Sequence, residues 1–135
     1  MAEKKLEGAG LRGQVAGQTA LSTVGKEGKG LTYRGYAIEE LSEKASFEEV
    51  AYMLLYGNLP NQSELSKYKE KLKKYRELPS ELKKVLELIP ASAHPMDVLR
   101  TGCSFLGNIE PEGDFSNQTD IADRLISIFP SVVCY

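Results

Sequence analysis

From Ile38 to the last residue, apolar side chains recur at spacings of three and four, with no alternation of strand and helix segments. This spacing places the apolar residues on one face of a helix, and each helix must bury that face against another element. The pattern predicts an all-α fold for residues 38–135. Residues 1–37 are rich in Gly, Thr, Ser and Ala, and we expect them to form an extended arm with a short β-hairpin.

Local start and stop signals divide the helical part. Ser46 begins the sequence SFEE, a capping box in which Ser46 and Glu49 satisfy each other's backbone amides, and Gly57 suits the end of that helix. A first helix is expected over residues 38–45. Later helices are predicted over residues 63–78, 80–90, 95–107 and 119–135. We expect Gly107 and Pro111 to end the one that begins at Pro95.

Composition excludes several classes of function. The chain has 135 residues, enough for one small domain, and a formal net charge of −2. That charge argues against binding to nucleic acid or to an anionic membrane surface. No apolar run approaches the roughly 18 residues that span a bilayer, and no apolar segment marks a signal peptide. Cys103 and Cys134 suggest no disulfide framework, so a cytoplasmic location is expected. The turn GKEGKG does not fit the phosphate-loop pattern.

The only histidine, His94, invites a catalytic interpretation because it lies beside Asp97 and Arg100. Cys103 is nine residues further on, more than two helical turns away, so the two side chains cannot meet through one helix. One His and two distant Cys also make no tetrahedral metal site. We therefore favour a structural role for His94 at a helix start, with general acid/base catalysis as the alternative.

The segment SELSKYKEKLKKYREL carries an apolar stripe of Leu65, Tyr68, Leu72 and Tyr75. The rest of its surface is basic, with Lys67, Lys69, Lys71, Lys73, Lys74 and Arg76. A surface helix with a solvated basic face explains this pattern. The functional alternative is that one of these cations meets an anionic substrate or cofactor.

Two stretches resemble the N-terminal part of the citrate synthase family. They are GLRGQVAGQTALSTVGKEGKGLTYRGYAIEELSEKASFEEVAYMLLYGNLP and HPMDVLRTGCSFLG. Together, VGKEGKGLTYRGY and HPMDVLRTG are most similar to the bacterial 2-methylcitrate synthase branch. The resemblance implies the helical fold of this family and a homodimeric, cytoplasmic enzyme. Its substrates would be oxaloacetate and propionyl-CoA or acetyl-CoA, with no metal and no resident cofactor, because the thioester and the keto acid already carry the reactivity.

The resemblance also implies which residues are needed. In this family an aspartate removes the α-proton of the thioester, one histidine stabilises the enol, and another polarises the oxaloacetate carbonyl. This chain has one histidine, so we expect it to contain no catalytic residue and to be inactive alone. Residues 38–135 would be part of the large domain of a longer enzyme, cut inside a helix at the apolar end SVVCY. The alternatives are citrate synthase proper and a non-catalytic helical interaction module.

The family also has a basic residue associated with substrate binding on the helix that follows Gly-x-Leu-Pro. Lys73 is the best match to it here, and Lys71 is the next.

Overall fold

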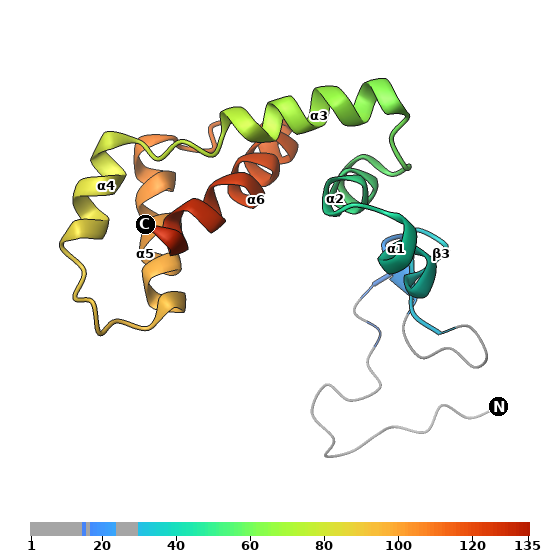
Figure 1. Ribbon diagram of the computed structural model, residues 1–135, viewed down its shortest axis with the longest axis horizontal. Coiled ribbons are helices and arrows are strands. Elements are labelled where there is room, and N and C mark those ends of the chain that lie inside the picture. The colour runs from blue at the N-terminus through green and yellow to red at the C-terminus, as the bar shows by residue number, and fades with distance from the viewer. Residues whose placement is uncertain (1–14, 16, 24–29) are drawn as a thin grey trace, which may run out of the picture.

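The computed structural model describes residues 15, 17–23 and 30–135. Within this part of the chain, a small antiparallel sheet precedes six α-helices, which confirms the all-α fold class with a short β arm (Figure 1). The turn GKEGKG, except for Gly30, lies outside the described residues. The elements are β1 (Ser22–Thr23), β2 (Thr32–Tyr33), β3 (Tyr36–Ala37), α1 (Ile38–Lys44), α2 (Phe47–Tyr56), α3 (Gln62–Lys74), α4 (Ser80–Glu87), α5 (Pro95–Ile109), the 3-10 helix η1 (Phe115–Asn117) and α6 (Gln118–Cys134).

The sheet contains one turn that the sequence pattern did not indicate. Strands β2 and β3 are joined by a two-residue loop in which Arg34 and Gly35 have φ angles of 50° and 92°. A positive φ at both positions is what a type I′ hairpin requires, and it costs a non-glycine residue about 1 kcal/mol. The guanidinium Nη2 of Arg34 donates to the carbonyl of Leu54 at 3.0 Å, in the last turn of α2. This bond satisfies a carbonyl near the end of α2 and ties the hairpin to that helix.

The predicted helix caps are present. Ser46 Oγ accepts from the amide of Glu49, whose carboxylate accepts from the amide of Ser46, and Gly57 adopts φ 101° at the end of α2. His94 starts α5 as expected: its Nδ1 accepts from the amide of Met96 at 3.2 Å. A second capping box, at Asn61 and Glu64, begins α3.

Three helix ends differ from the prediction. Helix α3 ends at Lys74 and α4 at Glu87, each several residues before the predicted end. Helix α5 continues past Gly107 to Ile109, because an isolated glycine inside a helix costs only about 1 kcal/mol, which tertiary packing can offset. Pro130 lies inside α6 without ending it.

Helix α3 joins two groups of elements. It packs on α2 at one end and on α6 at the other, while α5 packs on both α4 and α6 (Figure 1). The larger apolar core lies among α4, α5 and α6, together with the segment that precedes α4. Its buried members are Leu78, Leu82, Leu86, Leu106, Ile128 and Val132. The smaller core lies between α2 and α3 and contains Ala51, Tyr68 and Leu72. The stripe predicted on α3 therefore faces inward at three of its four positions; Tyr75 is half-buried.

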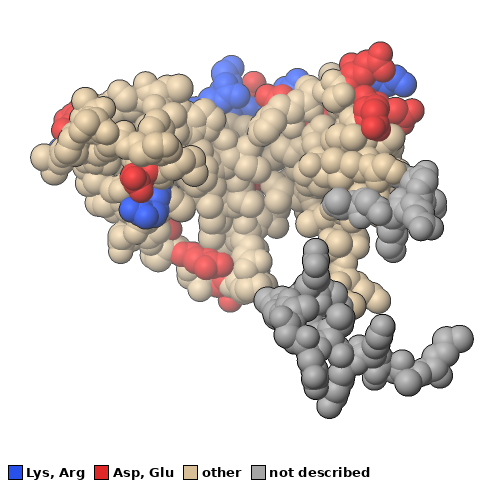
Figure 2. Space-filling model, turned by 90° about the horizontal axis from the view of Figure 1, so that it is seen from below, with Lys and Arg blue, Asp and Glu red and all other residues tan. Residues whose placement is uncertain are grey.

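Several large apolar side chains remain on the surface. Leu88, Met96 and Phe115 are more than 60% exposed. One face of the molecule also carries only a few scattered charged groups (Figure 2). Among the described residues, no helix combines the length and hydropathy that crossing a bilayer requires.

Candidate functional site

The two lysines that the sequence singles out occupy different surroundings. Lys73 has a side chain that is 69% exposed, and its nearest carboxylate is Glu70, with Nζ and Oε1 3.9 Å apart. Lys71 turns toward α6, where its ammonium forms ion pairs with Asp120 and Asp123. The structure thus brings Lys71, but not Lys73, into a group of polar side chains.

This group, the Asp123 cluster, consists of Tyr56, Tyr68, Lys71, Asp120 and Asp123, and it joins α2, α3 and α6. Asp123 is completely buried. Its Oδ2 accepts from the hydroxyl of Tyr56 at 2.5 Å and from Lys71 Nζ at 2.6 Å, and its Oδ1 accepts from the hydroxyl of Tyr68 at 2.8 Å. A buried carboxylate is stable only when its oxygens are paired in this way.

The ammonium group of Lys71 has no donor to spare. It donates to Asp120, to Asp123 and, at 3.3 Å, to the hydroxyl of Tyr56, which accounts for all three of its N–H bonds. An external anion would have to displace one of these partners. Lys73 carries the same charge on an exposed side chain whose only ion pair among the described residues is the 3.9 Å approach to Glu70, so it can bind a carboxylate or phosphate without breaking a contact that orders the fold.

The cluster favours the protonated forms of its donors. Burial raises the pKa of Tyr68 and Tyr56 above the ordinary value, and their hydrogen bonds to Asp123 add to the shift. Burial opposes the charged form of Lys71, but hydrogen bonds to Asp120, Asp123 and Tyr56 outweigh it and raise the pKa of the ammonium. Each of these groups therefore binds its proton more tightly in the folded chain than in the unfolded chain.

This difference predicts a loss of stability at alkaline pH. In the unfolded chain tyrosine and lysine release protons near pH 10, whereas in the folded chain they hold them to higher pH. The stabilisation is complete below about pH 10 and is lost as the pH rises through the higher folded values. We expect the Tm to fall above about pH 10. Circular dichroism melting curves should show a smaller fall for Tyr68→Phe than for the unchanged protein; equal falls would contradict a role for the cluster.

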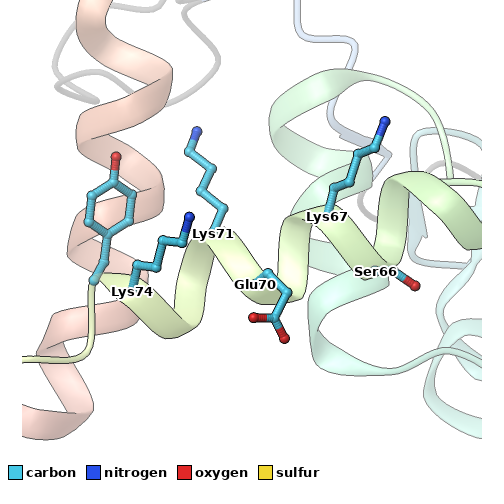
Figure 3. Close-up of a pocket in the computed structure, with 6 residues that line it drawn as sticks. Ser66, Lys67, Glu70, Lys71 and Lys74 are labelled. Atoms are coloured by element: carbon cyan, nitrogen blue, oxygen red, sulfur yellow. The ribbon is translucent and has the colours of Figure 1, made fainter.

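A shallow hollow of about 610 Å³ lies along α3 beside the cluster, lined by Ser66, Lys67, Glu70, Lys71, Lys74 and Tyr75 (Figure 3). Lys67, Lys71 and Lys74 extend to one side of the helix, and Glu70 points to the other. The charge of Lys71 is neutralised by its ion pairs with Asp120 and Asp123, so Lys67 and Lys74 supply the positive potential that attracts anions on this side. The basic face that the sequence predicts therefore exists, next to a surface depression.

Other candidate residues take up structural positions. His94 caps α5 through its Nδ1, as described above. Cys103 and Cys134 are free thiols, half-buried and exposed respectively. Within the described part of the chain, no three His, Cys, Asp or Glu side chains come together as metal ligands would.

Sequence reasoning did not single out Asp123 or Tyr56, and it placed Tyr68 only in the apolar stripe of α3. A signal for Asp123 was available, since it stands three residues before Ile126, which packs against the smaller core, and therefore on the same face of α6. A carboxylate at a core-facing position requires a partner, which predicts a network without saying which side chains complete it.

Comparison with known proteins shows which family the chain resembles. A family model described as "Citrate synthase, C-terminal domain" matches residues 10–135. The 2-methylcitrate synthase of Shewanella oneidensis is 66% identical over 132 residues, which are 98% of this chain and 35% of that protein.

Solved structures agree with the sequence comparison. The crystal structure of citrate synthase from Thermotoga maritima superposes with a TM-score of 0.81 at 35% identity, over 94% of this chain and 33% of that one. Citrate synthase from Thermoplasma acidophilum, solved as a ternary complex with carboxymethyl coenzyme A and oxaloacetate, gives a TM-score of 0.78 at 27% identity, over 87% of this chain and 32% of that one. The chain spans about a third of the length of these relatives. With nearly all of its residues matched by the family model and by the fold of solved members, the chain belongs to the citrate synthase family.

Proposed function

We propose that this chain is the N-terminal portion of a 2-methylcitrate synthase, which condenses propionyl-CoA with oxaloacetate to give 2-methylcitrate and CoA. The observation that carries the proposal is the 66% identity to the Shewanella oneidensis enzyme over 98% of the chain. Acetyl-CoA as the acyl donor, giving citrate, is the second candidate, and the resemblance to solved citrate synthases supports it.

The catalytic step would use residues outside this chain. The family mechanism needs one histidine to stabilise the enol and another to polarise the oxaloacetate carbonyl, with an aspartate as the base. His94 is the only histidine in these 135 residues, and its Nδ1 is engaged in capping α5. The role of this chain is then to supply part of the helical framework of the large domain. We further propose a cytoplasmic homodimer without a resident cofactor.

The test is a chimera in which this chain replaces the matching segment of the Shewanella oneidensis enzyme. We expect the chimera to release CoA from propionyl-CoA in the presence of oxaloacetate, measured as free thiol. The separate 135-residue chain should release none above background, because it lacks a second histidine. A folded chimera without thiol release would favour the alternative of a non-catalytic interaction module. Turnover by the separate chain would contradict the assignment of catalysis to other residues.

Lys73, and after it Lys71, is proposed to contact an anionic group of a substrate. A charge-assisted hydrogen bond contributes roughly 1.5–3 kcal/mol, so we expect Lys73→Ala in the chimera to raise the Michaelis constant for one substrate by about tenfold or more. The Tm should hardly change, because Lys73 is exposed and alanine favours helices.

Two further variants make this test decisive. Lys84→Ala, at an exposed lysine of α4, removes the same charge elsewhere and should leave both Michaelis constants unchanged. Lys71→Ala should lower the Tm, because it breaks the Asp123 cluster. If neither Lys73→Ala nor Lys71→Ala changes a Michaelis constant, the basic face is only solvated surface.

A further inference from the structure

A separate cavity of about 290 Å³ opens where the start of α2 and the segment after α3 meet α6. Its apolar lining includes Phe47, Leu72 and Ile126, and its polar lining includes Glu48, Arg76 and Ser127. Clefts that hold small molecules have volumes from roughly 300 Å³ upward, so this one matches a small ligand. Nothing in the proposed condensation uses these residues.

Behind the lining of the cavity lies a polar group without a partner. Ser127 is 6% exposed, and its Oγ forms no hydrogen bond with any described residue. Leaving a buried hydroxyl unpaired costs about 1–3 kcal/mol, so native proteins retain few such groups. Pro130, which also lines the cavity, has no N–H, so the carbonyl of Ile126 loses its usual helical donor. This turn of α6 therefore offers unused hydrogen-bonding capacity beside the cavity.

The cavity also brings together two opposite charges that do not neutralise each other. Glu48 and Arg76 both line it, yet neither forms an ion pair with the other or with any further described residue. A ligand with a single charge would meet one favourable and one unfavourable group. A ligand with one positive and one negative group matches both, and the apolar lining suits an aliphatic body between or beside them.

We propose that this cavity binds a free α-amino acid with an aliphatic side chain. The carboxylate of the ligand pairs with the guanidinium of Arg76, and its ammonium group pairs with the carboxylate of Glu48. Leu72 and Ile126 pack against the side chain.

Isothermal titration of the 135-residue protein with leucine tests the proposal. We expect saturable binding, and at least tenfold weaker binding of two analogues that each lack one charge. Leucinamide lacks the carboxylate, and 4-methylpentanoate lacks the ammonium group. No saturable binding of leucine would overturn the proposal, and so would binding of either analogue as tightly as leucine.

Variants locate the binding site. Arg76→Gln and Glu48→Gln change surface charges without disturbing the core, and each should weaken leucine binding about tenfold. Ser127→Ala should raise the Tm of the ligand-free protein, because it removes an unpaired buried hydroxyl, and should bind leucine normally, because that hydroxyl is not exposed to the cavity. Lys84→Gln is the matched charge control and should bind leucine normally. Unchanged binding by both Arg76→Gln and Glu48→Gln would place leucine elsewhere and overturn the assignment.

Discussion

Replacing Asp123 by alanine is expected to destabilise the chain by about 3–5 kcal/mol, the range found when one member of a buried ion pair is removed. The substitution deprives Tyr56, Tyr68 and Lys71 of a shared acceptor at the junction of α2, α3 and α6. The hydroxyl of Tyr68 suffers most, because this residue is 3% exposed and water cannot replace the lost carboxylate. For a chain of this length the Tm should fall by roughly 10 °C or more.

Two further variants distinguish the effect of losing the buried carboxylate from the effect of losing a negative charge. Asp120 pairs with the same lysine but is 65% exposed, so Asp120→Ala should cost about 1 kcal/mol or less. Asp123→Asn keeps an oxygen that can accept from a tyrosine and should fall between the two alanine variants. Urea unfolding of the four proteins gives the comparison. Equal losses for Asp120→Ala and Asp123→Ala would show that the cluster acts only as a surface ion pair.

The helices could be predicted because their signals are local. Three such signals act within a single turn, and the structure confirms each of them. They are the capping box of Ser46 and Glu49, the helix end at Gly57, and the helix start at His94 before Pro95. The helix ends at Lys74, Glu87 and Ile109 were predicted less well, because packing against neighbouring helices competes with local preference there.

The Asp123 cluster could not be predicted in the same way, because its members are distant in sequence. Tyr56 and Tyr68 lie 67 and 55 residues from Asp123, and only the packing of α2 and α3 against α6 brings them together. From the sequence, Lys73 is preferred to Lys71 as a substrate-binding residue only because its position in the helix better matches the basic residue of the family. The structure adds a physical distinction between them, since the three donors of Lys71 are engaged with α2 and α6, whereas Lys73 is exposed. Whether either contacts substrate stays a prediction.

The packing of α5 on α6 depends on a glycine. At Gly102 an added Cβ would lie 2.9 Å from Cγ1 of Val132, closer than real Cβ contacts come, and 3.9 Å from Leu82. The missing side chain therefore lets the two helices approach within the main apolar core. We expect Gly102→Val to destabilise the chain by about 3 kcal/mol, the upper end for overpacking, because both the backbone of α5 and the branched side chain of Val132 resist displacement.

A double-mutant cycle and a matched control test this contact by urea unfolding. Val132→Ala alone should cost roughly 2 kcal/mol through lost burial, but it opens the space that a larger residue 102 needs. The double variant should therefore be more stable than the sum of the single effects by about 1–3 kcal/mol. Gly107→Val makes the same substitution on the same helix, where nothing lies within 4 Å, and should change stability by about 0.5 kcal/mol or less. Additive effects in the cycle would mean that Gly102 is required for the conformation of α5 and not for its approach to α6.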